Sequence, residues 1–159
     1  NLKLTPTGRH YGTPMYMSPE IATGDPNLDE RSDVFALGVI LFEMLTLQSF
    51  VDGEDIIEIK EKILEKPYPL PREVAPHREI PRDLQALCMK ALQRKKSRRY
   101  PNIIQFLDDL QKFRHGEEVS VYWYSGWEKL TRWNHRNAYL ILSVVSAAVG
   151  AGFYALFSN

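Results

Sequence analysis

The sequence predicts a mainly α-helical chain, and three observations support this fold class. Apolar residues recur at helical spacing in several segments, and no stretch alternates convincingly with the period of two that marks a strand. Two further runs are apolar on every side, which is typical of helices that are buried or that span a membrane. The 159 residues, 44% hydrophobic and 25% charged, have the composition of a folded domain.

The first all-apolar run, residues 34–47, predicts the fully buried central helix of a soluble core. Its sequence is VFALGVILFEMLTL, in which Glu43 and Thr46 are the polar positions. This run is too short to cross a bilayer. The residues just before it supply capping side chains and negative charge that favour a helix N-terminus: Asp29, Glu30, Ser32 and Asp33.

Three apolar stripes predict amphipathic helices around this core. The first lies within residues 54–66, and the others follow Pro81 and Pro101, since proline suits the first helical turn. The proline-rich residues 66–81 could bind a partner domain, but a stiff surface connection is the simpler interpretation. The stripes consist of Ile56, Ile59 and Ile63; of Leu84, Leu87, Cys88, Ala91 and Leu92; and of Ile103, Phe106, Leu107, Leu110 and Phe113.

The second all-apolar run predicts a transmembrane helix at residues 138–157. This stretch, AYLILSVVSAAVGAGFYALF, carries no charge. At about 1.5 Å per residue its length is about 30 Å, the thickness of the hydrocarbon core of a bilayer. Lys129, Arg132 and Arg136 precede the run and no charged residue follows, so its N-terminal side is expected in the cytoplasm. We therefore expect a single-pass protein of the cell membrane.

The segment before this span, residues 116–137, combines aromatic and basic side chains. Trp123, Trp127, Leu130 and Trp133 are spaced so that they share one helical face. Tryptophan favours the headgroup region and basic residues favour an anionic leaflet, which predicts contact with membrane lipid. The alternative is that these aromatic residues pack on the preceding domain.

Small residues recur along the predicted span. Ser143, Ala147 and Ala151 lie four positions apart, and Ala148 pairs with Gly152 in the same way. Such a face allows two helices to approach closely, so we hypothesise a weak parallel homodimer through the transmembrane helix. An equally good interpretation is that the small residues simply face lipid.

Composition excludes several other functions. The formal net charge is zero, which argues against a strongly basic nucleic-acid-binding protein, and the run RKKSRR at residues 94–99 is better interpreted as a solvated loop. The single cysteine, Cys88, excludes an internal disulfide and a Cys-rich zinc site. The four histidines are far apart, so no local histidine cluster for a metal is predicted.

Three motifs, in a fixed order, carry a family resemblance. Residues 12–20 read GTPMYMSPE, Asp33 begins DVFALGVILFEMLT, and Arg99-Tyr100 precedes the last amphipathic stripe. Together they resemble the large lobe of eukaryotic-type protein kinases, in which GTxxYMxPE closes the activation segment and the second motif begins a buried central helix. With the aromatic-basic segment and the span, the chain resembles the membrane-anchored Ser/Thr kinases of bacteria.

This resemblance implies three parts of the chain. We expect a partial kinase domain, comprising the end of the activation segment and the helical C-lobe, then a juxtamembrane helix and one transmembrane helix. The expected boundaries are 1–115 for the partial kinase domain, 116–137 for the basic-aromatic juxtamembrane segment and 138–157 for the transmembrane helix.

The resemblance also implies roles for particular residues. Glu20 is expected to form a buried ion pair with Arg99, because a planar guanidinium can bind a carboxylate through two parallel hydrogen bonds. Asp33 is expected to accept backbone hydrogen bonds from the catalytic loop. Thr13 is expected to contact the catalytic aspartate, as in kinases that modify Ser/Thr rather than Tyr. The loop that binds the substrate residue after the acceptor is expected to consist of Gly12, Thr13, Pro14, Met15, Tyr16 and Met17.

The first residues resemble the phosphorylatable part of an activation segment. Thr5 and Thr7 are the candidate phosphorylation sites, with Thr7 preferred because it lies six residues before Thr13. A phosphate there would add nearly two negative charges and could order the loop against basic residues. An unmodified, solvated loop is the alternative.

The motifs that bind ATP are missing from the sequence. Phosphoryl transfer needs a Gly-rich loop, a strand lysine, the HRD aspartate with its asparagine and the DFG aspartate, and none of these motifs occurs here. ATP and Mg are therefore implied for a full-length kinase but not for this chain, which also begins with Asn1 and is expected to be a piece of a longer protein. The predicted function is a fragment of a membrane-anchored Ser/Thr kinase that acts on protein substrates. The alternative is a non-catalytic membrane-bound kinase remnant that acts as a binding or scaffold module.

Overall fold

The computed structural model describes residues 14–139, 142–143 and 146. Thr5, Thr7, Gly12 and Thr13 lie outside these residues, as does most of the predicted span at 138–157. The described part is mainly helical and contains no strand. The prediction of a mainly α fold is thereby confirmed for this part of the chain.

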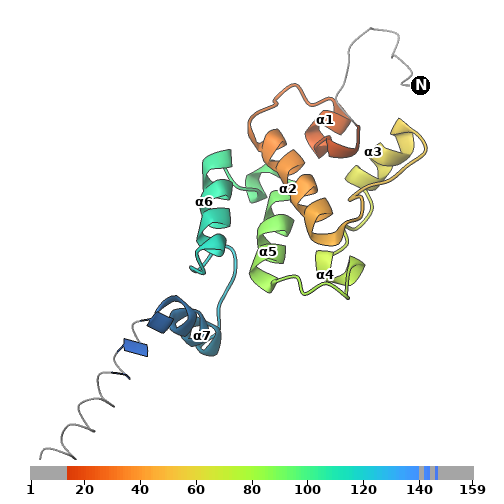
Figure 1. The fold of residues 1–159 in the computed structure, drawn as a ribbon. Coiled ribbons are helices and arrows are strands. Elements are labelled where there is room, and N and C mark those ends of the chain that lie inside the picture. Colours follow the sequence, from red (N-terminus) through yellow and green to blue (C-terminus); the bar gives the residue numbers. More distant parts are fainter. Residues whose placement is uncertain (1–13, 140–141, 144–145, 147–159) are drawn as a thin grey trace, which may run out of the picture.

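One long helix, α2, lies at the centre of the molecule (Figure 1), with α1 and α3 on one side and α5 and α6 on the other. Helix α7 lies at one end of the molecule, beyond α6. In chain order the elements are η1 (Pro14–Tyr16), α1 (Pro19–Thr23), α2 (Arg31–Thr46), α3 (Ile56–Leu64), α4 (Pro71–Val74), α5 (Arg82–Ala91), η2 (Lys96–Arg98), α6 (Ile103–Arg114) and α7 (Gly126–Arg136).

The three amphipathic stripes form α3, α5 and α6, as predicted. Side chains of Asp55 and Asn102 cap α3 and α6 by accepting backbone N–H bonds of the first turn. The two prolines lie slightly earlier than expected: Pro81 is the N-cap of α5, and Pro101 precedes the N-cap of α6. Both therefore lie ahead of the first helical turn, where the fixed φ of proline is equally acceptable.

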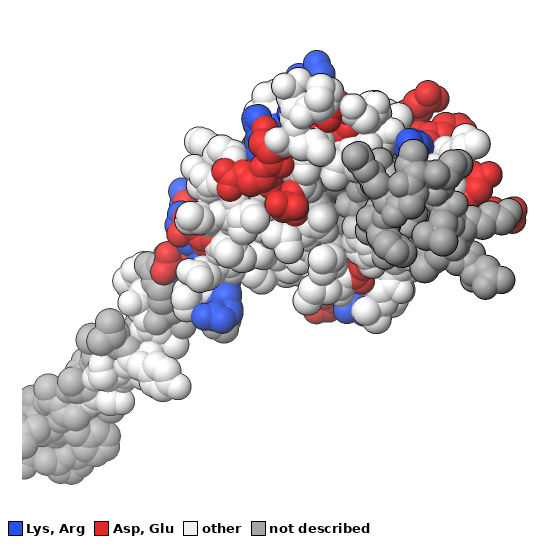
Figure 2. All heavy atoms as spheres, turned by 90° about the horizontal axis from the view of Figure 1, so that it is seen from above, with Lys and Arg blue, Asp and Glu red and all other residues white. Residues whose placement is uncertain are grey.

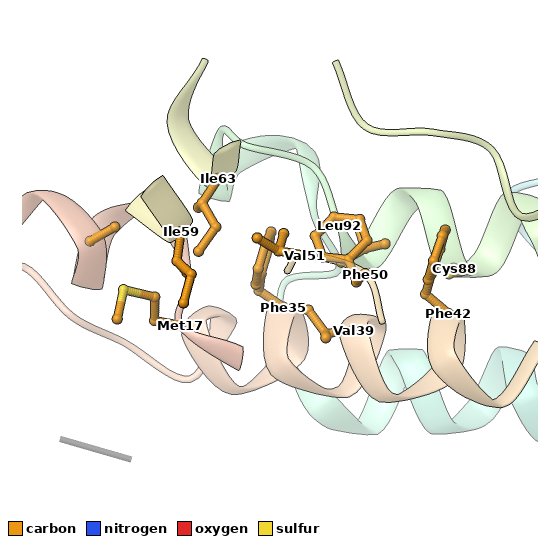
Figure 3. Packing of buried hydrophobic residues seen from close by; sticks show 11 residues of the cluster. Met17, Phe35, Val39, Phe42, Phe50, Val51, Ile59, Ile63, Cys88 and Leu92 are labelled. Carbon is orange, nitrogen blue, oxygen red and sulfur yellow. The ribbon is translucent and has the colours of Figure 1, made fainter. Parts of the chain in front are cut away.

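The main core lies between α2, α3 and α5. Phe35, Val39 and Phe42 project from one side of α2 toward Phe50 and Leu92 (Figure 3). The ring of Phe50 meets those of Phe35 and Phe42 edge-on, with centroids 6.2 and 5.1 Å apart. Such aromatic contacts add specific geometry to the burial of apolar area. This core fixes α2 against the elements on its α3 side.

A second core forms on the other side of α2, and it extends past α6. Its buried members include Val34, Leu87 and Phe106, together with Val119 and Tyr124 from the segment between α6 and α7. The residues that follow α6 are thus packed into the same body as the helices before it.

Helices α2 and α5 approach closely at Gly38. A Cβ atom at this position would lie 2.9 Å from the Cβ of Ala91 and 3.2 Å from side-chain atoms of Leu92. We expect Gly38→Ala to lower the free energy of unfolding by about 1–3 kcal/mol, because the overpacked helices must shift apart. Gly126→Ala is the control, since nothing lies within 4 Å of its Cβ position, and it should not lower the free energy of unfolding in chemical denaturation. Equal effects of the two substitutions would contradict the close approach.

The expectation that α2 is fully buried was wrong for one of its faces. Ile40 and Met44 are 44% and 66% exposed, and Leu47, just after the helix, is 73% exposed. These positions share one side of the helix. A helix that is apolar all round needs partners on every side, and the described residues cover the sides that face α4, α5 and α6 but not this one.

None of the helices within the described residues is long and apolar enough to cross a membrane. The transmembrane helix at 138–157 and its homodimer therefore stay predictions.

Candidate functional site

Two short helices position the residues of the expected ion pair. Pro19 occupies the first turn of α1, and Gly24, which directly follows the helix, has a left-handed φ of 74°. Glu20 follows Pro19 in that first turn. Arg99, the other member of the pair, directly follows η2.

Glu20 and Arg99 lie together in the interior and form a bidentate pair. The two terminal nitrogens of Arg99 donate to Oε1 and Oε2 of Glu20, both at 2.7 Å. The side chain of Glu20 is 4% exposed and that of Arg99 is 0% exposed. Two parallel charge-assisted bonds fix the orientation of both groups, so the pair ties α1 to the loop before α6.

Every N–H group of the Arg99 guanidinium has a partner. Besides the two bonds to Glu20, the group donates to three backbone carbonyls. Its plane also lies over the ring of Phe35, 4.9 Å from the centroid. The carbonyl oxygens belong to Arg31, Gln93 and Arg94, at 2.8, 2.6 and 3.0 Å. A lysine, with a single ammonium, could not make this set of contacts.

Ser32 is a third member of this cluster that the sequence did not reveal. Its hydroxyl donates to Oε1 of Glu20 at 2.6 Å and is buried. From the sequence, Ser32 was expected to cap α2, but the N-cap is Glu30, which makes no side-chain cap bond. A serine near a helix N-terminus looks like a cap in the sequence, and only the folded position of Glu20 gives it this different role.

The pKa of Glu20 reflects these contacts. Burial alone would raise it, but hydrogen bonds from Arg99 and Ser32 outweigh burial and lower the pKa of Glu20 to about 2. Since an unfolded glutamate titrates near 4.5, the ionised pair stabilises the fold above that pH and the contribution is lost as pH falls toward 2.

We therefore expect the free energy of unfolding to fall by on the order of 3 kcal/mol more between pH 5 and pH 2 in the natural chain than in Glu20→Gln. Chemical denaturation at a series of pH values measures this difference. Parallel pH profiles for the two proteins would show that Glu20 does not titrate with a lowered pKa.

Asp33 lies in the first turn of α2 and is exposed. Among the residues that the structure describes, its carboxylate has no hydrogen-bond or ion-pair partner. By helical periodicity it lies on the same side of α2 as Ile40 and Met44. One side of the central helix thus presents a carboxylate at its start and apolar side chains further along.

The described part of the expected substrate loop is tied to α2. Pro14 and Met15 form η1 with Tyr16, whose hydroxyl donates to Oε2 of Glu43 at 2.9 Å. This bond raises the pKa of Tyr16. Met17 is buried in the main core beside Ile59 (Figure 3). The loop is therefore held at both of these points.

The bond to Tyr16 also explains why an acidic residue, Glu43, occurs in this helix. Glu43 is the single acidic residue in the apolar run of α2, which was the only sign that the position is special. Its partner, Tyr16, lies 27 positions away in the chain, so no local pattern connects them.

The protein kinase domain family matches residues 3–109, about two thirds of the chain. The chain therefore belongs to the protein kinase family.

Several bacterial kinases are similar to this chain. Serine/threonine-protein kinase PknD of Chlamydia pneumoniae is 38% identical over 118 residues, covering 72% of this chain and 12% of that protein. Serine/threonine-protein kinase PknB of Mycobacterium tuberculosis is 35% identical over 115 residues, covering 72% and 18%. Tyrosine-protein kinase MasK of Myxococcus xanthus is 38% identical over 109 residues, covering 69% and 16%. The chain thus spans less than a fifth of the length of these relatives.

Proposed function

We propose that this chain is the helical large lobe of a bacterial Ser/Thr protein kinase, and that the full-length protein transfers the γ-phosphate of ATP to protein substrates. The bidentate pair of Glu20 with Arg99 is the observation that carries this proposal, because it fastens the end of the activation segment to the helices that follow. The similarity to PknD and PknB supports serine or threonine as the acceptor residue. Tyrosine is the alternative acceptor, because MasK is a tyrosine-protein kinase.

The exposed side of α2, which carries Asp33, Ile40 and Met44, is where we place the missing catalytic residues. We propose that a segment outside this chain covers Ile40 and Met44 and that its backbone N–H groups bond to Asp33. Covering this side would remove the exposed apolar surface from water, which favours association. In this arrangement η1 would lie beside the catalytic loop and would contact the substrate residue after the acceptor, while the buried Met17 would hold this loop to the core.

ATP and magnesium would be bound by that other segment. Within the described residues, no three His, Cys, Asp or Glu side chains are grouped so that they could hold a metal ion. The chain also lacks the Gly-rich, HRD and DFG motifs.

The isolated chain is therefore expected not to bind Mg-ATP. Isothermal titration calorimetry of residues 1–159 should give no heat beyond dilution. Stoichiometric binding would contradict the assignment of the ATP site to another segment.

We further propose that the protein is anchored in the cell membrane by residues 138–157, with the lobe in the cytoplasm. The length of this uncharged run and the basic residues before it support the proposal. A homodimer through the small residues of the span would bring two activation segments close together, and Thr5 and Thr7 are the candidate acceptors in them.

The test of the kinase function uses the longer protein encoded with this chain. Incubated with Mg-ATP and a general protein substrate, it should yield phosphoserine or phosphothreonine on phosphoamino-acid analysis. Phosphotyrosine would place it with MasK in specificity. An absence of transfer by a folded protein would favour the non-catalytic membrane-bound remnant, which would then act as a binding module.

A further inference from the structure

Helix α7 contacts the rest of the molecule through its polar side. Arg132 forms an ion pair with Asp83 of α5, and Glu128 accepts a hydrogen bond from the hydroxyl of Tyr122 at 3.1 Å. Lys129 pairs with Glu118 at 2.8 Å. These partners all lie before α7 in the chain, so charged and polar groups hold the helix to the lobe.

The contact at Asp83 is buried. Asp83 is 2% exposed and also accepts a hydrogen bond from the hydroxyl of Tyr124 at 3.0 Å. The guanidinium of Arg132 lies over the ring of Tyr124, 4.7 Å from its centroid, and donates to the carbonyl of Glu117 at 3.2 Å. One arginine thus joins α7 to α5 and to both ends of the connecting segment.

A second buried carboxylate fixes the connecting segment itself. Asp109 of α6 is 1% exposed and accepts bonds from the backbone N–H and the hydroxyl of Ser120, at 2.9 and 2.6 Å. The hydroxyl of Tyr100 donates to the same carboxylate at 3.0 Å. Because the segment is held at Ser120 and again at Tyr124, α7 begins from a defined position.

The apolar side of α7 points away from the lobe. Trp127, Leu130 and Trp133 are 73%, 48% and 51% exposed, and Trp123, just before the helix, is 92% exposed. Their exposure contradicts the alternative in which these residues pack on the preceding domain. A helix that packs only on a soluble core turns its apolar side toward that core and its polar side toward water.

The surrounding surface agrees with this arrangement. Figure 2 shows acidic and basic side chains scattered over the lobe, while the described surface that leads from it toward the C-terminal end is mostly uncharged. The chain continues from α7 into the uncharged run at 138–157. Tryptophan prefers the boundary between headgroups and acyl chains.

We propose that the face of α7 formed by Trp127, Leu130 and Trp133 lies in the bilayer interface while Arg132 holds the opposite face to Asp83, so that the lobe is kept in one orientation against the membrane. This inference rests on the proposed membrane anchor. It also predicts that Lys129 and Arg132 contribute little to binding anionic lipid, because both are already paired with carboxylates.

Tryptophan fluorescence tests the contact with lipid directly. The protein has three tryptophans, and all of them lie on or beside this face. The full chain is reconstituted in phosphatidylcholine vesicles with and without lipids brominated close to the headgroup. We expect the brominated lipid to remove most of the emission, and to the same degree when phosphatidylglycerol is added.

Three results would overturn the proposal. Unquenched tryptophans in a chain that resists alkaline extraction would place α7 off the bilayer while leaving the membrane anchor and the kinase function intact. Quenching that appears only with phosphatidylglycerol would show that the basic residues are free for lipid. A chain released by alkaline extraction would contradict the membrane anchor itself, and the face of α7 would then belong to another partner, such as a second copy.

Distances between spin labels test whether Arg132 fixes the position of α7 relative to the lobe. Labels at Ile104→Cys of α6 and Thr131→Cys of α7 lie at exposed positions. Burial raises the pKa of Cys88 to about 12, so this thiol does not react with the labelling reagent at neutral pH. In vesicles we expect one narrow distribution of label distances.

Arg132→Gln should broaden this distribution severalfold, while Lys129→Gln, which breaks an exposed pair on the same helix, should leave it narrow. A broad distribution in the unsubstituted chain, or a narrow one in Arg132→Gln, would contradict a fixed orientation.

Discussion

Replacing Arg99 with alanine is expected to lower the free energy of unfolding by about 3–5 kcal/mol, since it leaves the Glu20 carboxylate buried without its counter-charge. It also removes the donors for three backbone carbonyls. Chemical denaturation of the full chain in detergent measures the change, and a longer kinase carrying the same substitution should lose activity together with stability.

The neighbouring Arg98 provides the control for this substitution. It is exposed, so Arg98→Ala should change the free energy of unfolding by less than about 0.5 kcal/mol. A double variant, Glu20→Ala with Arg99→Ala, should be less destabilised than the sum of the two single variants, because no charge is left unpaired. Strict additivity, or equal effects at Arg98 and Arg99, would mean that the pair does not hold the fold.

Phe35→Ala is expected to have an effect of similar size, about 3–5 kcal/mol, because it opens a cavity at the centre of the main core. The ring is completely buried, meets Phe50 and Tyr68 at centroid distances of 6.2 Å, and lies under the Arg99 guanidinium. The loss should therefore also weaken the ion pair above it, and the pKa of Glu20 should rise.

Phe35→Leu separates packing from the presence of an aromatic ring. It keeps most of the apolar volume, so its cost should be clearly smaller than that of alanine. Denaturation curves at pH 7 and near pH 3 would show whether the residual loss depends on Glu20. A change below about 1 kcal/mol for Phe35→Ala would contradict the tight packing around this ring.

The helices that the sequence predicted well are those with one apolar side. In α3, α5 and α6 the spacing of apolar residues identified the helices and most of the side that is buried, although Ile56 and Leu107 of the predicted stripes are 41% and 46% exposed. In α2 the pattern carries no such information, because every side is apolar. Which side is covered depends on the neighbouring segments, and the exposure of Ile40 and Met44 could not be inferred from the run itself.

Contacts of the site could be predicted from the sequence only where the family motifs include both residues of a pair. The resemblance to kinases paired Glu20 with Arg99 across 79 positions, which no local rule would connect. Ser32 and the backbone carbonyls around Arg99 have no such motif. In α7 the shared face of the tryptophans followed from helical spacing, but Lys129 and Arg132 were expected to face lipid. Their carboxylate partners, Glu118 and Asp83, become neighbours only in the folded chain.

A chimeric kinase tests the central claim, that this chain is the working large lobe of a Ser/Thr kinase. The region of PknB that aligns with this chain is replaced by the corresponding residues, and transfer of phosphate from ATP to a Ser/Thr peptide is measured. We expect a chimera that melts cooperatively and transfers phosphate to serine or threonine, and we expect Asp33→Ala to abolish transfer while Asp52→Ala, in an exposed pair with Lys62, does not. A chimera that folds and binds ATP but transfers no phosphate would contradict the account.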